Sequence, residues 1–132
     1  MLIESITIIH YALNQGGYNM AIKAIMCDID GTLLSSKGYV TDKTVEMIKK
    51  AREKGILFGL STGRDVNSIQ TLLKDWHIDG LVDLIVGTGG AEIYDYTLNI
   101  SKAQYPLDGE SIKEIIAHFK DMDCNFAITE NG

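Results

Sequence analysis

The chain has 132 residues, of which 45% are hydrophobic and 23% are charged, and its formal net charge is −6. These values are ordinary for a soluble globular domain with a core of its own. The chain is acidic and has no basic block, so a nucleic acid is not an expected partner. No apolar run is long enough to span a membrane, and two cysteines without a CxxC pattern favour reduced thiols and a cytoplasmic location.

Residues 1–19 stand apart from the rest of the chain. They contain no Lys or Arg and no long apolar run, which argues against a secretory signal peptide. One interpretation is an additional strand or helix that packs on the domain. Another is that residues 15–20 are encoded by CAAGGAGGTTATAATATG, which contains the bacterial ribosome-binding sequence AAGGAGGT shortly before ATG. On that hypothesis Met20 is the natural start and residues 1–19 are a translated leader, which the codons of the gene decide.

From Met20 onward, apolar strands are expected to alternate with amphipathic helices. The expected strands are the β-branched and apolar runs 22–29, 56–61 and 81–87. Thr41 is a suitable cap for a helix that ends before Gly55, and Asp65 opens a second helix whose apolar residues keep helical spacing as far as Trp76. This order predicts right-handed crossovers and a three-layer α/β fold with a parallel sheet.

The pattern changes after the third expected strand. Residues 91–96 and 98–106 have the character of meander strands, residues 109–122 form an amphipathic helical pattern, and residues 124–129 resemble a further strand. We therefore predict a core unit over residues 20–96. The start of a second α/β unit is expected over residues 97–132.

Acidic residues stand at the end of the first expected strand, at the edge of the sheet where open α/β folds bind their ligands. Asp28 and Asp30 are two residues apart, so both carboxylates are expected to face one cleft while Ile29 turns away. Such a pair can bind a hard cation such as Mg²⁺ together with a phosphate. One carboxylate can also attack phosphorus while the other serves as general acid and base. Gly31 permits a sharp turn that brings backbone N–H groups close to a phosphate.

The second expected strand ends in the sequence STGR at 61–64. Thr62 offers a hydroxyl, Gly63 an open backbone, and Arg64 a cation just before a helix N-terminus, which are all features of an anion site. The third strand ends in the glycine-rich sequence 87–91, which is expected to be flexible backbone with room for a ligand. Neither the acidic pair nor STGR is by itself specific for a phosphate site. The two motifs together, in this order, predict a site that binds phosphate.

The sequence DIDGTLL at 28–34, followed by STGR at 61–64, resembles the haloacid dehalogenase-like hydrolases. The resemblance is to the Cof-type, sugar-phosphatase branch, which has a large α/β cap between its second and third core motifs, and it covers residues 22–132. It implies that Asp28 is the nucleophile that becomes phosphorylated and that Asp30 is the general acid and base. It also implies that Mg²⁺ is bound by the Asp28 carboxylate and the Asp30 backbone carbonyl.

The same resemblance implies that Thr62 holds the transferring phosphoryl group and that Gly63 and Arg64 shape the pocket beside it. The implied substrates are sugar phosphates and similar small phosphorylated metabolites. Gly89 departs from the family pattern, because many Cof-type proteins have asparagine there. The resemblance therefore implies the type of reaction more strongly than it implies the choice of substrate.

The family also requires a lysine and a G-D-x-x-N-D motif in the second half of its core. No G-D-x-x-N-D motif follows STGR in these 132 residues, and the lysines that do follow it, at 74, 102, 113 and 120, stand before or within the expected start of the cap. The resemblance therefore implies an incomplete Rossmann-like core followed by the start of a cap, with an exposed apolar edge on the first strand. We expect these residues by themselves to be catalytically inactive.

The motifs also suit three other classes of protein to different degrees. A phosphomutase of the same superfamily would share Asp28 and Asp30 and return the phosphoryl group to a sugar. A non-catalytic truncated product would carry the motifs without turnover. A two-component receiver domain needs an aspartate at the end of the third strand, where this chain reads IVGTGG at 85–90, so that class is disfavoured.

Overall fold

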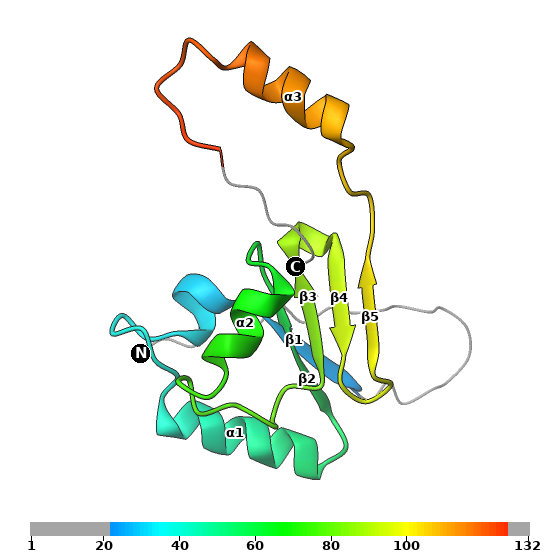
Figure 1. Ribbon diagram of the computed structural model, residues 1–132. Coiled ribbons are helices and arrows are strands. Elements are labelled where there is room, and N and C mark those ends of the chain that lie inside the picture. Colours follow the sequence, from blue (N-terminus) through cyan, green and yellow to red (C-terminus); the bar gives the residue numbers. More distant parts are fainter. Residues whose placement is uncertain (1–21, 127–132) are drawn as a thin grey trace, which may run out of the picture.

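The structure is a computed structural model that describes residues 22–126 (Figure 1). Its elements are β1 (Ala24–Cys27), the short turn η1 (Ile29–Leu33), α1 (Asp42–Glu53), β2 (Leu57–Ser61), α2 (Val66–Leu72), β3 (Leu84–Gly87), the short turn η2 (Thr88–Gly90), β4 (Glu92–Asp95), β5 (Ile100–Ala103) and α3 (Gly109–His118). The proposed leader, residues 1–19, lies outside the described residues. Among residues 22–126, every helix is too short or too polar to cross a lipid bilayer.

The strands form one five-stranded sheet in the order β1-β2-β3-β4-β5. The first three strands are parallel, and β4 and β5 are added antiparallel to β3 and to each other. The α/β fold and the meander after the third strand are thus confirmed, with the parallel part confined to β1–β3. The division at residues 96 and 97 stays a prediction, although β5 is hydrogen-bonded to β4 within the same sheet.

The hydrophobic core lies on one face of this sheet. Cys27, Leu60 and Ile85 pair across the first three strands, and all three side chains are buried. Ile48 of α1 and Ile69 of α2 join the same buried cluster, as expected when two right-handed crossovers step in the same direction. Both helices therefore cover one face, and the three-layer core is incomplete within the described residues.

The opposite face and the outer edge of the sheet are much less covered. Leu57 is 48% exposed on the opposite face, and β1 is the last strand of the sheet among residues 22–126. Such an edge presents backbone N–H and C=O groups that a further strand can pair with. The expectation of an uncovered β1 edge agrees with this arrangement.

Local capping explains where the first two helices begin and end. The Thr41 hydroxyl accepts the Thr44 N–H at 3.2 Å, and Gly55, with φ of +75°, reverses the chain after α1. The Asp65 carboxylate accepts the Ser68 N–H at 2.7 Å at the start of α2. However, α2 ends at Leu72, so the prediction of a helix as far as Trp76 is too long. Residues 73–77 form turns, and Trp76 is buried from these turns and not from a helix.

The last described segment differs from prediction. In Figure 1, α3 stands away from the sheet, and its apolar side chains Ile115, Ile116 and Phe119 are 40%, 38% and 37% exposed. The predicted strand over 124–129 is wrong for residues 124–126, which have no strand beside them, and residues 127–129 lie outside the described residues.

Candidate functional site

The first acidic residues lie in the turn that follows β1. Ile29 is fully buried while Asp28 is half-buried and Asp30 is exposed, so the alternation expected from the sequence holds here. The Thr32 hydroxyl donates to Asp28 Oδ2 at 3.3 Å, and the Leu33 N–H donates to the Asp28 carbonyl at 3.1 Å. These bonds hold the Asp28 carboxylate at the end of the strand.

Gly31 makes the tight turn after Asp30 possible. Its φ is +78°, a conformation that side chains with a Cβ rarely adopt, and a Cβ built there would find open space. The requirement for glycine is therefore conformational and not a matter of crowding. An open approach to the backbone at this position is what a phosphate-binding turn needs.

The second loop places a buried hydroxyl next to an open backbone. Thr62 is 8% exposed, and its Oγ1 accepts the Arg64 N–H at 3.2 Å, while its own N–H donates to the Val86 carbonyl at 3.0 Å. Gly63 is exposed, and its N–H has no acceptor among residues 22–126. Thr62 is therefore fixed by the sheet, and the Gly63 N–H is available to a ligand.

A bidentate ion pair joins the two loops. Arg64 Nε donates to Asp30 Oδ2 at 2.9 Å, and Arg64 Nη2 donates to Asp30 Oδ1 at 2.7 Å. The hydrogen bond from Arg64 lowers the pKa of Asp30, and the same contact raises the pKa of Arg64. The sequence-predicted residues at the ends of β1 and β2 are thus brought together by the fold.

The loop after β3 is hydrogen-bonded to the Thr62–Arg64 loop after β2. The Thr88 N–H donates to the Arg64 carbonyl at 2.8 Å, and the Gly89 N–H donates to the Thr62 carbonyl at 3.1 Å. A Cβ at Gly87 would lie 2.9 Å from the Arg64 carbonyl oxygen. Gly87 therefore permits close backbone packing. The room for a ligand that the sequence predicts over residues 87–91 is open at Gly89 and Gly90 and absent at Gly87.

The start of α2 is occupied by carboxylates. The Val66 N–H donates to Glu92 Oε2 at 2.8 Å, and Asp65 caps the helix through Ser68, whose hydroxyl lowers the pKa of Asp65. The expectation that this helix N-terminus assists anion binding stays a prediction, and in this structure the Val66 and Ser68 N–H groups already have carboxylate partners within the chain. Glu92 was not singled out by sequence reasoning, because only the antiparallel placement of β4 beside β3 brings it to this helix.

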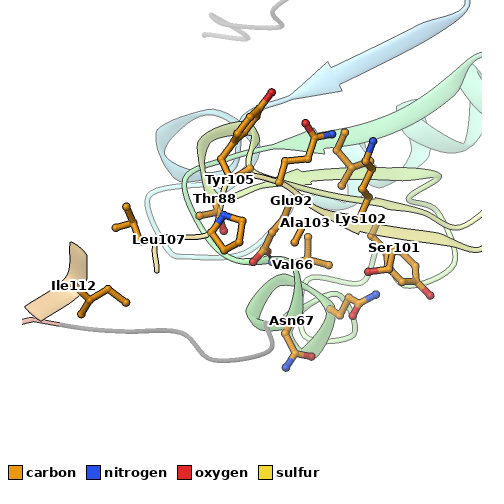
Figure 2. A pocket seen from close by; sticks show the side chains of 16 residues that line it. Val66, Asn67, Thr88, Glu92, Ser101, Lys102, Ala103, Tyr105, Leu107 and Ile112 are labelled. Atoms are coloured by element: carbon orange, nitrogen blue, oxygen red, sulfur yellow. Dashed lines mark hydrogen bonds between the residues drawn. The ribbon is translucent and has the colours of Figure 1, made fainter. Parts of the chain in front are cut away.

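A broad hollow of about 890 Å³ lies between α2, the β4–β5 hairpin and the start of α3, with Val66, Glu92, Lys102 and Ile112 among its lining residues (Figure 2). Neither acidic residue of the first loop lines it. Thr62 and Arg64 do not line it either, so the hollow is distinct from the site at the ends of β1 and β2.

The residues available for a divalent cation are few. Among residues 22–126, no cluster of three or more His, Cys, Asp or Glu side chains suits a metal ion. The Asp28 carboxylate and the Asp30 carbonyl are oxygen donors of the kind that Mg²⁺ prefers, and Mg²⁺ commonly keeps several waters and shares substrate phosphate oxygens. This donor set fits part of a Mg²⁺ coordination sphere, with the Asp30 carboxylate itself engaged by Arg64.

An acidic turn after β1 and a threonine–arginine loop after β2 thus meet at one edge of an open α/β sheet. Residues 25–132 match the family of haloacid dehalogenase-like hydrolases, and the chain belongs to this family. The resemblance to its Cof-type branch is thereby confirmed.

Relatives and solved structures agree on this assignment. A protein of Buchnera aphidicola is 36% identical over 94 residues, covering 70% of this chain and 33% of its own length. The 5-amino-6-(5-phospho-D-ribitylamino)uracil phosphatase of Bacillus subtilis is 30% identical over 79 residues, covering 60% and 30% of the two chains. A solved subclass IIB sugar phosphatase superimposes with a TM-score of 0.62 at 26% identity, covering 74% of this chain and 37% of that one. The chain thus spans about a third of the length of the curated relatives it matches.

Proposed function

We propose that this chain carries the first half of the catalytic site of a Mg²⁺-dependent, cytoplasmic phosphatase that hydrolyses sugar phosphates or similar small phosphomonoesters. The observation that carries the proposal is the bidentate contact of Asp30 with Arg64, which puts the acidic turn of β1 beside the Thr62 loop of β2. The similarity to named phosphatases, including the sugar phosphatase, supports the substrate class.

Asp28 is the proposed nucleophile. One carboxylate oxygen forms a bond to phosphorus while the bond from phosphorus to the leaving oxygen breaks, which gives an aspartyl-phosphate and an alcohol. In the second step, water attacks the same phosphorus, the bond to Asp28 breaks, and inorganic phosphate leaves. Asp28 suits this role because it is half-buried at a strand end and held by Thr32 and the Leu33 N–H.

Asp30 is the proposed general acid and base. In its protonated form the Asp30 carboxyl gives a proton to the leaving oxygen in the first step. The resulting carboxylate takes a proton from the attacking water in the second step, which restores the acid. In this proposal the Thr62 hydroxyl and the Gly63 N–H donate hydrogen bonds to the transferring phosphoryl oxygens, and the Arg64 guanidinium offers a geometry that matches a phosphate. The buried position of Thr62 and the exposure of Gly63 support these roles. Mg²⁺, held by the Asp28 carboxylate and the Asp30 carbonyl, would offset the negative charge that gathers there.

We also propose that these 132 residues by themselves turn over phosphomonoesters poorly or not at all. Phosphoryl transfer depends on a cation set that surrounds the phosphoryl group. The sequence after STGR has no G-D-x-x-N-D motif, and two oxygen donors give Mg²⁺ an incomplete shell. The Asp28 site would then bind phosphate without efficient hydrolysis.

A chimera tests the catalytic assignment. Residues 25–132 would replace the aligned part of the B. subtilis phosphatase, and inorganic phosphate release would be measured with and without Mg²⁺. We expect activity that Asp28→Asn abolishes and that Glu46→Gln, an exposed change on α1, leaves intact. An active chimera that keeps its rate with Asp28→Asn would overturn the proposal, and phosphoryl return to a sugar without phosphate release would identify a mutase.

A further inference from the structure

The guanidinium of Arg64 has two neighbours that hold it in one place. Asp30 accepts two hydrogen bonds from one side, at 2.7 and 2.9 Å, and the ring of Trp76 lies 5.9 Å from the guanidinium carbon. That spacing is within the range of a cation–π contact. Trp76 is 5% exposed and therefore a fixed wall, whereas the Asp30 side chain is 57% exposed and free to move toward solvent.

This arrangement conflicts with the role of Asp30 in phosphoryl transfer. Both Asp30 carboxylate oxygens accept hydrogen bonds from Arg64, so a leaving oxygen or a water would have to share each of them with the guanidinium. A phosphate group presents the same kind of paired oxygen atoms to a guanidinium, and it carries more charge than a carboxylate. The substrate is thus a direct competitor of Asp30 for Arg64.

We propose that Arg64 exchanges partners when a phosphate group binds: the guanidinium leaves the Asp30 carboxylate for the phosphate oxygens, and the freed carboxylate can then take up a proton from solvent. The proposal rests on the phosphatase assignment for its catalytic meaning, but partner exchange itself is a property of anion binding. It makes the general acid available only when a phosphate occupies the site.

The strength of the pair suits such an exchange. The Arg64 and Asp30 side chains are 39% and 57% exposed, and an exposed ion pair adds little stability. The Arg52–Asp83 pair is a contrast within the same chain, because its side chains are 33% and 11% exposed and Asp83 also binds a backbone N–H. The exposed Arg64–Asp30 pair can therefore be displaced by an anion more easily than the more buried Arg52–Asp83 pair.

Trp76 provides a direct readout, because it is the only tryptophan in the chain. Inorganic phosphate would be titrated into the 132-residue chain in the presence of MgCl₂, with tryptophan emission and calorimetry recorded in parallel. We expect a saturable change of Trp76 emission with the same midpoint as the heat signal. Phosphate binding by calorimetry without a change in emission would overturn the exchange, and so would the absence of saturable binding.

A double-mutant cycle of Asp30→Asn and Arg64→Gln then separates exchange from simple charge repulsion. If Asp30 competes for Arg64, Asp30→Asn tightens phosphate binding more when Arg64 is present, by roughly two- to fivefold over its effect in Arg64→Gln. If Arg64 stays with Asp30 throughout, Arg64→Gln exposes the Asp30 charge, and Asp30→Asn then tightens binding more in the Arg64→Gln background. The sign of the coupling therefore decides between them.

Matched controls come from α1. Glu46 and Lys50 form another exposed ion pair, and Glu46→Gln and Lys50→Gln make the same charge changes away from the site. We expect both to leave phosphate affinity within about twofold of the parent chain. The outcome is separable from that of the chimera: loss of Asp28-dependent hydrolysis there would defeat the phosphatase assignment, whereas a coupling of the wrong sign here would defeat only the exchange.

Discussion

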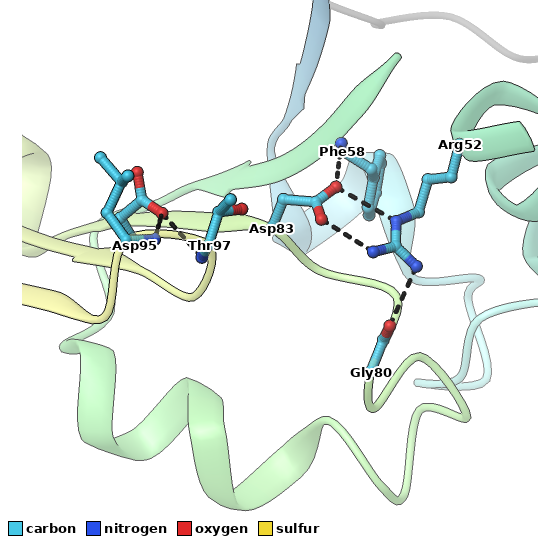
Figure 3. Close-up of polar contacts among 7 residues, drawn as sticks. Arg52, Phe58, Gly80, Asp83, Asp95 and Thr97 are labelled. Carbon is cyan, nitrogen blue, oxygen red and sulfur yellow. Dashed lines mark hydrogen bonds and ion pairs between the residues drawn. The ribbon is translucent and has the colours of Figure 1, made fainter. Parts of the chain in front are cut away.

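Arg52 and Asp83 join the end of α1 to the residue before β3 through two parallel hydrogen bonds, of 3.1 Å from Nε and 2.8 Å from Nη2 (Figure 3). Asp83 is 8% exposed and also accepts the Phe58 N–H at 2.9 Å, while Arg52 donates to the Gly80 carbonyl at 3.0 Å. One carboxylate therefore organises the amino ends of two parallel strands, at the opposite end of the sheet from Asp28.

Removing the Asp83 carboxylate should cost much of the stability of the fold. Asp83→Ala leaves the Phe58 N–H buried without an acceptor and Arg52 without its partner. We expect the free energy of unfolding, measured with urea, to fall by about 2–4 kcal/mol. Glu46→Ala breaks an exposed pair and should cost less than about 0.5 kcal/mol. A similar small loss in both variants would show that the Asp83 cluster does not hold the strands together.

The same cluster predicts how stability depends on pH. Burial by itself would raise the pKa of Asp83, but the hydrogen bonds from Arg52 and the Phe58 N–H, together with the charge of Arg52, lower it. Because the pKa is lower in the folded than in the unfolded chain, where it is about 3.9, the ionised group stabilises the fold above that pH. This contribution is lost as the pH falls through the folded pKa.

Asp83→Asn should remove that pH-dependent contribution. The difference in unfolding free energy between the parent chain and the variant should be largest above about pH 4 and should shrink at lower pH. Urea unfolding at a series of pH values measures it. A difference that is constant across this range would mean that the Asp83 pKa is the same in the folded and unfolded chains.

Gly87 should tolerate no side chain. A Cβ there would lie 2.9 Å from the Arg64 carbonyl oxygen and 3.1 Å from the Val66 N, so Gly87→Ala forces two backbone segments apart. We expect a loss of about 1–3 kcal/mol in unfolding free energy, together with weaker phosphate binding, since the Arg64 loop would shift. Gly109→Ala is the matched control, because its Cβ would meet nothing within 4 Å. Equal stability of the two variants would contradict the close approach.

The hydroxyl of Thr62 should matter more than its shape. In the active chimera, Thr62→Val keeps the buried volume but removes the donor proposed for the phosphoryl group, and we expect kcat to fall by roughly 10²-fold. Thr62→Ser keeps the hydroxyl and should retain most of the rate. The comparison of kcat for the two variants is decisive: equal rates would assign Thr62 to packing alone.

Much of the fold could be predicted from local pattern. The caps Thr41 and Asp65, and the stop at Gly55, fall where predicted, because capping depends on a side chain and the backbone within a few residues of it. The end of α2 could not be predicted, because the apolar spacing that continues to Trp76 is compatible both with a longer helix and with the turns that the chain forms. Only the packing of Trp76 into the core, beside Arg64, selects the turns.

The candidate site divides in the same way. The sequence by itself determined that Asp28, Asp30 and Thr62 stand at the ends of successive parallel strands, because strand order and side-chain alternation follow from short-range patterns. Only the tertiary structure decided that Arg64 donates hydrogen bonds to Asp30, and that Glu92 accepts the N–H group at the start of α2. These contacts join residues 34 and 26 positions apart, and a contact between distant residues depends on how strands are arranged and how loops approach, which no local pattern records.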